Sequence, residues 1–436
     1  MKQSTHVAKT KDSTTRTFEY KIKPNKKFVA ACEQALNASR FVYNCALEQR
    51  IRVYEASGKS IGFYEQSRQL TEARQEIPEL KACLRTIQSD ALERLDAAFD
   101  AFFRRLKNGE KPGFPRFKGR ERYDTFSQKI EAQRACPLKG DKLTVPGVGF
   151  CRVRLSRPIE GRCKQLRITR RADGWYALLV CELAKPDPLP QTGQTVGVDV
   201  GLTHFATLST GEKIENPRQL KQASGALTKY QRRLSKKKKG SKNRVKARQK
   251  VALRHLKVQR ARKDFHHKTA ADLVKRFDRI AVEDLNVKGL VKNHHLAQAI
   301  SDVAWSQFFG ILQSKAAEAG RQFERVNPRY TSQDCSGCGQ RQKMPLAIRT
   351  YKCGQCGLII CRDVNAAHNI LGASGPDENK SPWRRDSVSK KRERDGRNER
   401  RPSGAKRVAR PVCDANTNVY LDAQPGESSS TFLMGV

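Results

Sequence analysis

The sequence predicts a multidomain fold that combines α/β and all-β regions, and three observations predict it. The first 190 residues hold several short alternating segments, interrupted by one long stretch of helical spacing. From Thr195 onward, apolar strands alternate with helical segments, as in an α/β fold. Two Cys-x2-Cys pairs lie near the end of this second region. With 436 residues, the chain is long enough for roughly two to four domains.

The balance of charge restricts the function. The chain has 86 Lys and Arg residues against 44 Asp and Glu, a formal net charge of +42, so it needs a polyanionic partner or an anionic surface. No apolar run reaches the roughly 18 residues that a membrane span needs. The first twenty residues lack the apolar stretch of a secretory signal. We therefore expect a cytoplasmic protein that is not secreted, has no membrane partner and binds nucleic acid, with reduced or metal-bound cysteines.

The first 190 residues are predicted to form a β module with a helical insertion. The segment "RTFEYKIKPN" alternates like a strand, whereas residues 27–107 have the spacing of amphipathic helices. Short strands follow between residues 123 and 185, and "AKPDPLPQTGQ" is typical of a linker. Residues 1–26 and 108–190 are therefore assigned to the β module, and the region between them to a helical lobe.

Four cysteines have the spacing of a metal site. Two Cys-x2-Cys pairs are separated by fourteen residues, and each pair is followed by a glycine that allows a tight turn. This pattern is typical of tetrahedral zinc, and the site is predicted to be structural because protein fills all four positions. Cys361 lies nearby but breaks the pattern. The predicted zinc ligands are Cys335, Cys338, Cys353 and Cys356.

Three acids stand beside apolar segments. Asp199 lies inside "VGVDVGLTHF", Glu283 closes "DRIAVEDL", and Asp363 precedes a short helix. Taken singly, each is typical of a solvated strand end or a helix cap. Together, a strand-borne Asp, a strand-borne Glu and a late Asp at a helix start are what an RNase H-like fold uses to hold two Mg²⁺ ions. Asp284 should point to the opposite face of its strand.

A long basic tract follows the first acid. Residues 216–263 include no acidic residue, and they are predicted to form two helices that meet near Gly240. Such a tract favours contact with a nucleic-acid backbone over a merely solvated face. His266 and His267, just beyond it, are predicted to lie on a helix surface. The residues predicted to contact nucleic acid here are Lys229, Arg232, Arg233, Lys236, Lys237, Lys242, Arg244, Lys246, Arg248 and Lys250.

A second candidate for nucleic-acid contact is the loop "KPGFPRFKGRERY". Aromatic and basic residues are interleaved in it, so Phe114, Arg116 and Tyr123 are candidates for contacting bases. The alternative is a turn that simply packs against its neighbours.

Several blocks taken together resemble the TnpB proteins, the OrfB-type accessory transposases of insertion sequences. The blocks are "VGVDVGLTHFATLSTG", "DFHHKTAADLVKRFDRIAVEDLNVKGLVKN", "LAQAISDVAWSQFFGILQSKA", "TSQDCSGCG" and "RTYKCGQCGLIICRDVNAAHNIL". The resemblance implies an RNA-guided DNA endonuclease that works as a monomer with guide RNA and target DNA. It also implies that the catalytic acids are Asp199, Glu283 and Asp363. One departure is Cys361, which stands where the family usually has an acid.

The resemblance also implies an architecture. An RNase H-like (RuvC) nuclease domain would span residues 191–330 and 358–373, with a zinc ribbon at 331–357 inserted in it, and the β module would be an oligonucleotide-binding barrel. Composition predicts that residues 374–436 are a disordered basic tail. Two alternatives are a transposase that performs strand transfer itself and an RNA-guided repressor that does not cut. The sequence has no His-hydrophobe-His motif for the first, and the intact set of three acids argues against the second.

Overall fold

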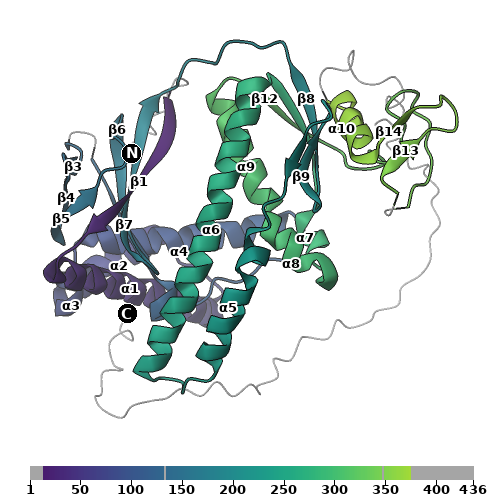
Figure 1. The fold of residues 1–436 in the computed structure, drawn as a ribbon. Coiled ribbons are helices and arrows are strands. Elements are labelled where there is room, and N and C mark those ends of the chain that lie inside the picture. Colours follow the sequence, from purple (N-terminus) through teal and green to yellow (C-terminus); the bar gives the residue numbers. More distant parts are fainter. Residues whose placement is uncertain (1–12, 132–133, 346–347, 375–436) are drawn as a thin grey trace, which may run out of the picture. The chain divides into compact units, whose positions relative to one another are not determined.

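A computed structural model describes residues 13–131, 134–345 and 348–374. Within these ranges the expected combination of α/β and all-β regions is confirmed (Figure 1). The predictions for the first twelve residues and for the tail after Ser374 lie outside the described residues. No described helix is both long and apolar enough to cross a membrane.

The first region is a seven-stranded antiparallel sheet with the order β2-β6-β7-β1-β5-β4-β3. Alternate residues of β1 and β7 are buried, which is the period of two that a half-buried strand requires. The strand that the sequence predicts after residue 15 is confirmed as β1. The strands are β1 (Ser13–Lys23), β2 (Thr125–Lys129), β3 (Leu138–Lys139), β4 (Lys142–Val145), β5 (Gly149–Arg154), β6 (Arg162–Arg171) and β7 (Gly174–Ala184).

Helices are inserted between β1 and β2, as the spacing of apolar residues predicts. The first begins where the Asn25 side chain accepts a hydrogen bond from the Phe28 amide, and it ends at Gly58 in the left-handed conformation. Its apolar face packs with the sheet and the other helices into one core. The helices are α1 (Lys26–Ser57), α2 (Phe63–Glu76), α3 (Pro78–Lys81) and α4 (Arg85–Lys107).

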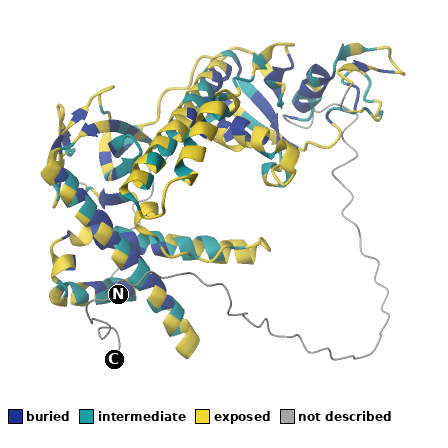
Figure 2. Ribbon diagram, turned by 60° about the horizontal axis from the view of Figure 1, so that its bottom comes forward, coloured by how far each residue is buried: buried dark blue, intermediate teal, exposed yellow. Residues whose placement is uncertain are grey.

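The second region has a five-stranded mixed sheet with the order β10-β9-β8-β11-β12. β8, β11 and β12 are parallel, whereas β9 and β10 form antiparallel pairs at one side. Figure 2 shows the buried residues of this region concentrated in the sheet and in the helix faces that cover it. The strands are β8 (Thr195–Val200), β9 (His204–Leu208), β10 (Lys213–Glu215), β11 (Arg279–Glu283) and β12 (Gln322–Val326).

Helices cover both faces of this sheet. α6 and α9 pack on one face and α10 on the other. α5 and α6 form a long antiparallel hairpin that turns at Gly240, as the sequence predicts. A two-stranded sheet, β13 (Thr350–Lys352) with β14 (Ile359–Cys361), precedes α10. The helices are α5 (Gln219–Ser235), α6 (Lys242–Arg276), α7 (Val287–Leu290), α8 (His294–Val303), α9 (Trp305–Glu318) and α10 (Arg362–Gly372).

Candidate functional site

The alternation of side chains along β8 and β11 places two predicted acids on one face of the sheet. Val196 and Val198 of β8 belong to the core beneath α6 and α9. The residues between and after them, Gly197 and Asp199, must therefore face the other side, which α10 covers. On the neighbouring strand β11, Glu283 follows the same alternation, because Ala281 packs with Ile370 of α10. Asp199 and Glu283 thus face α10 from adjacent strands.

A glycine allows α10 to approach this face closely. A Cβ atom at Gly197 would lie 2.0 Å from the Ala367 carbonyl oxygen and 2.8 Å from the Leu371 nitrogen, both in α10. Only a residue without a side chain permits this contact. α10 begins with Arg362 and Asp363, so the close packing brings the third predicted acid to the same end of the sheet.

The pKa of Asp199 indicates that the three acids lie close together. Its pKa is raised well above the ordinary value, first by burial, and then by the negative charges of Glu283 and Asp363, while Arg362 opposes the rise. A carboxylate that is both desolvated and repelled by two neighbours is unfavourable unless cations compensate it. Glu283 and Asp363 both act on Asp199, so the three acids that the sequence singles out lie near one another at this end of the sheet.

Hydrogen bonds and an ion pair orient the other two acids. The buried Thr331 hydroxyl donates to Oε1 of the buried Glu283. Asp363 lies in the first turn of α10, and its Oδ1 is 3.7 Å from the Arg349 guanidinium. It does not cap the helix, because Cys361 occupies that position without a side-chain bond. Sequence reasoning did not single out Thr331, although it begins the block "TSQDCSGCG".

Two asparagines fasten α10 to the segment that carries Thr331. Asn369 donates to the carbonyl oxygens of Thr331 at 2.9 Å and Asp334 at 2.7 Å. Asn365 also donates to the Asp334 carbonyl at 2.7 Å, and its side-chain oxygen accepts from the Ser336 amide at 2.8 Å. The two residues are four positions apart and so share one face of the helix. Sequence reasoning missed both, and their helical spacing was the signal that could have found them.

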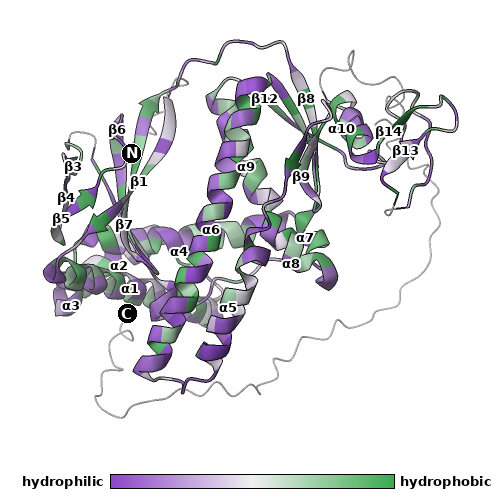
Figure 3. Ribbon diagram, in the orientation of Figure 1, coloured by the Kyte–Doolittle hydropathy of each residue, from purple (hydrophilic) through white to green (hydrophobic). Residues whose placement is uncertain are grey.

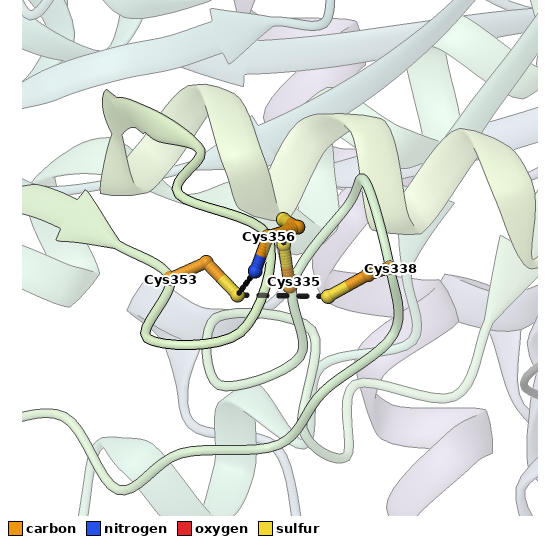
Figure 4. Close-up of side chains that lie close together, drawn as sticks. All are labelled: Cys335, Cys338, Cys353 and Cys356. Atoms are coloured by element: carbon orange, nitrogen blue, oxygen red, sulfur yellow. Dashed lines mark hydrogen bonds between the residues drawn. The ribbon is translucent and has the colours of Figure 1, made fainter.

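The four predicted zinc ligands converge (Figure 4). Their sulfur atoms all lie within 4.8 Å of one another, with 3.6 Å between Cys335 and Cys356 and 3.5 Å between Cys338 and Cys353. A tetrahedral zinc ion with Zn–S bonds of about 2.3 Å would hold its sulfurs about 3.8 Å apart. The donor set therefore fits zinc.

The glycines after the two pairs have the role expected of them. Gly339 and Gly357 have φ angles of 76° and 71°, in the left-handed region that favours glycine. Cys361 lies at the end of β14 and is not part of the cluster found among the described residues.

The α5–α6 hairpin presents most of its predicted basic residues to solvent, and Figure 3 shows it as largely hydrophilic. Two residues of the predicted set make hydrogen bonds or ion pairs with other residues, and Arg233 lies over the Tyr230 ring. Arg244 is half-buried and donates to the carbonyl oxygens of Leu234 at 3.1 Å and Lys237 at 2.8 Å, so it closes the turn between the helices. Arg248 pairs with Glu121. The other predicted residues of the hairpin are exposed.

In the loop "KPGFPRFKGRERY", two of the three candidate residues for contact with bases are exposed, whereas the third is packed in the core. Phe114 is 49% exposed and packs edge-on against Phe99 and Phe102, and Arg116 is exposed. Tyr123 is 5% exposed and lies against Tyr43, and burial raises its pKa to about 12. For Tyr123 the burial favours the packing interpretation over contact with bases, because its ring belongs to the core of the first region.

Three protein-family models match the chain. Residues 178–294 match a family described as "Probable transposase" (OrfB_IS605), and residues 305–370 match "Cas12f1-like, TNB domain". Residues 14–59 match a "Helix-turn-helix domain", and in the structure they form β1 and α1.

Relatives match over most of the chain. A protein of Streptomyces pristinaespiralis named "Putative RNA-guided DNA endonuclease" is 36% identical over 366 residues, 82% of this chain and 89% of that protein. "Putative RNA-guided DNA endonuclease InsQ" of Escherichia coli K12 is 29% identical over 378 residues, 82% of this chain and 92% of that protein.

Among solved structures, one titled "Cryo-EM structure of the Cas12f1-sgRNA-target DNA complex" has a similar fold, with a TM-score of 0.53 and 15% identity. The match covers 83% of this chain and 99% of that one. Fold and sequence together define the class, which is the OrfB-type proteins of insertion sequences. Within that class, the chain belongs to the TnpB family, and the resemblance drawn from its sequence blocks is confirmed.

Proposed function

We propose that this protein is an RNA-guided DNA endonuclease of a transposable element, which uses Asp199, Glu283 and Asp363 to cut target DNA. The observation that carries the proposal is the convergence of these acids at one end of a mixed sheet, in a protein of the TnpB family. The names of its relatives support the same activity. The description "Probable transposase" of the matching family keeps strand transfer as the second candidate, but the two relatives that match over most of the chain are named endonucleases, and no specific observation favours repression without cutting.

The three carboxylates fit a site for two Mg²⁺ ions. Hard cations prefer anionic oxygens, and the negative charge that raises the pKa of Asp199 is what bound cations would relieve. When bound, the metal ions supply an activated water and stabilise the attacking and leaving oxygens of the phosphodiester. Glu283 is held by the Thr331 hydroxyl, and Asp363 by the packing of α10 on Gly197. The chain itself thus positions the oxygens before any metal arrives.

We assign the second region to an RNase H-like (RuvC) nuclease domain at residues 191–330 and 358–373, with a zinc ribbon at 331–357. The placement of two acids on adjacent central strands, β8 and β11, supports the nuclease assignment. The first region is proposed as the oligonucleotide-binding module, and α1–α4 as its recognition lobe. Exposed basic residues of the α5–α6 hairpin would hold the phosphate backbone of the guide RNA or its duplex with DNA. Base pairing by the guide would then select the sequence, in a monomeric protein–RNA complex.

Two adjacent acids, Glu283 at the end of β11 and Asp284 directly after it, provide a matched test. Glu283→Gln keeps the size of the side chain but removes its charge, so it should abolish cleavage of target DNA while leaving RNA binding unchanged. Asp284→Asn is the control, because Asp284 is exposed, points away from the site and pairs at 3.3 Å with Arg325. It should cut at the rate of the unmodified protein. Equal rates for the two variants would disprove the assignment of Glu283.

The guide is tested separately by sequencing the RNA that copurifies with the protein when it is expressed with its own flanking DNA. A single discrete RNA that ends in sequence from beside the element supports the guided activity and supplies the target for the cleavage assay. A broad mixture of host RNA would instead indicate indiscriminate binding of polyanions and would favour an unguided nuclease or transposase.

A further inference from the structure

Three cysteines of the first region form a sulfur cluster apart from the four zinc ligands. Cys163 of β6 and Cys181 of β7 are directly opposite each other in the antiparallel ladder, and their sulfur atoms are 3.3 Å apart. Cys136, in the segment before β3, places its sulfur 3.0 Å from that of Cys163. The fold thus brings together three thiols that are at least 18 residues apart in the chain.

The three thiols differ in access. Cys163 is 5% exposed and Cys181 is fully buried, whereas Cys136 is only half-buried. An oxidant from solution would therefore meet Cys136 first. Cys163 lies directly behind it, at a distance from which sulfur can attack sulfur with little movement.

The environment also favours a reactive thiolate at Cys136. A hydrogen bond from the Cys163 thiol, the largest influence, lowers the pKa of Cys136 to about 6. The same contact raises the pKa of Cys163, which keeps that group a donor. By contrast, burial raises the pKa of the half-buried Cys45 in α1. Thiolates, and not thiols, react with peroxides, so these two half-buried cysteines should differ in reactivity.

We propose that Cys136 and Cys163 are a peroxide-sensitive pair that forms a reversible disulfide. In the first step, the Cys136 thiolate attacks hydrogen peroxide, an S–O bond forms, the O–O bond breaks, and the released hydroxide takes a proton to become water. In the second step, the Cys163 sulfur attacks the sulfenic acid at Cys136. An S–S bond forms, the S–O bond breaks, and the departing hydroxide combines with the thiol proton of Cys163. Two thiols lose two electrons, and one peroxide becomes two waters.

The disulfide would join the segment before β3 to β6. The thiol of Cys181 in β7 lies against Cys163, so it can undergo thiol–disulfide exchange with the oxidised pair. This chemistry is independent of nucleic-acid cleavage and goes beyond the proposed function. It would link the state of the β module to oxidative conditions in the cell.

Peptide mapping of the full-length, zinc-loaded protein tests the proposal. The protein is treated with hydrogen peroxide at pH 7, blocked with N-ethylmaleimide and digested with trypsin without reduction. Cleavage after Arg134, Lys139, Arg162 and Lys164 releases Cys136 in residues 135–139 and Cys163 in residues 163–164. We expect these two peptides joined, and released by dithiothreitol. We also expect N-ethylmaleimide to label Cys136 at least about tenfold faster than Cys45 in the untreated protein.

Two single-residue variants test whether the linkage depends on Cys136. Cys136→Ser should abolish the linkage, whereas Cys45→Ser, the matched half-buried control, should retain it. Because the mapping is done first on the unmodified chain, a variant that fails to fold leaves the test intact. The proposal is overturned if peroxide that oxidises Cys136 yields only its sulfinic acid. It is equally overturned if Cys136 stays a thiol under conditions that oxidise Cys45.

Discussion

The hydrogen bond from Thr331 to Glu283 offers the sharpest test of how the site is organised. Thr331→Val keeps the shape of the side chain but replaces the hydroxyl with a methyl group, so the hydrogen bond from Thr331 to Oε1 of Glu283 is lost. Both residues are buried, and the lost bond cannot be fully replaced by solvent. We expect Glu283 to rotate away from the position in which it holds metal, and cleavage to slow.

The magnitude follows from the charge of the acceptor. A hydrogen bond to a charged group contributes about 1.5–3 kcal/mol. If the whole contribution is made in the transition state, the rate should fall by about 10- to 150-fold, since 1.36 kcal/mol is tenfold in rate. Thr331→Ser retains the hydroxyl and should restore most of the rate.

Single-turnover cleavage of a labelled target by the protein–RNA complex measures this effect, at saturating and at limiting Mg²⁺. Binding of Mn²⁺ followed by its electron paramagnetic resonance, without DNA, gives a readout that does not depend on turnover. Thr331→Val should weaken the Mn²⁺ binding, and Thr331→Ser should not. An unchanged rate and unchanged Mn²⁺ binding in Thr331→Val would refute the idea that this hydroxyl positions Glu283.

Four further predictions concern other parts of the protein. Burial lowers the pKa of His266 to about 4, below its ordinary value of 6.5. As the pH falls, this histidine is therefore protonated in the unfolded chain at a higher pH than in the folded chain, which favours unfolding. The free energy of unfolding, measured with urea, should therefore drop by about 2 kcal/mol between pH 7 and pH 5, and His266→Gln should remove most of that drop. Gly197→Ala places a methyl group against the backbone of α10 and should destabilise the protein by about 1–3 kcal/mol; no change in melting temperature would show that α10 lies farther from β8. Removal of zinc with a chelator should speed hydrogen exchange of the amides in residues 331–338 as well as in residues 350–357, because the segment that begins at Thr331 carries the predicted ligands Cys335 and Cys338; a change confined to residues 350–357 would show that zinc does not constrain that segment. Alanine at four exposed hairpin positions should lower the salt dependence of log K for single-stranded RNA by up to about 3, and an unchanged slope would remove the hairpin from the RNA interface. The four positions are Arg232, Arg233, Lys236 and Lys237.

The orientation of Asp199 and Glu283 can be predicted because strands impose a strict alternation on their side chains, whereas the grouping with Asp363 was predicted from the RNase H-like arrangement of the three acids. The apolar residues of β8 and β11 show which face is buried under α6 and α9, so the opposite orientation of Asp199 and Glu283 follows. The four cysteines are equally predictable, because their spacing alone defines the metal knuckles. In both cases a local pattern carries the information.

Features that depend on contacts between distant segments could not be predicted in this way. Tyr123 stands in a basic, aromatic loop, yet packing against Tyr43 buries it. His266 was predicted to lie on a helix surface, but it is 1% exposed and its Nε2 lies 3.0 Å from the Val303 carbonyl oxygen. Nothing in the neighbouring sequence records how α6 packs against α8 and α9. The same limit hid Arg244, whose role in the hairpin turn depends on the path of the backbone around Gly240.

The hydrogen bonds around Thr331, which the sequence did not predict, connect the two predicted metal sites. The segment that begins at Thr331 holds Glu283 at one end and supplies the zinc ligands Cys335 and Cys338 at the other. α10, which carries Asp363, is fastened to this same segment by hydrogen bonds from two asparagines. The four-cysteine cluster begins four residues after Thr331, so zinc bound there, as we propose, would constrain the Thr331 hydroxyl because the short connection leaves the backbone little freedom. The segment that begins at Thr331 therefore joins the cysteine cluster to Glu283 and α10, and we propose that the two sites act as one hydrogen-bonded unit.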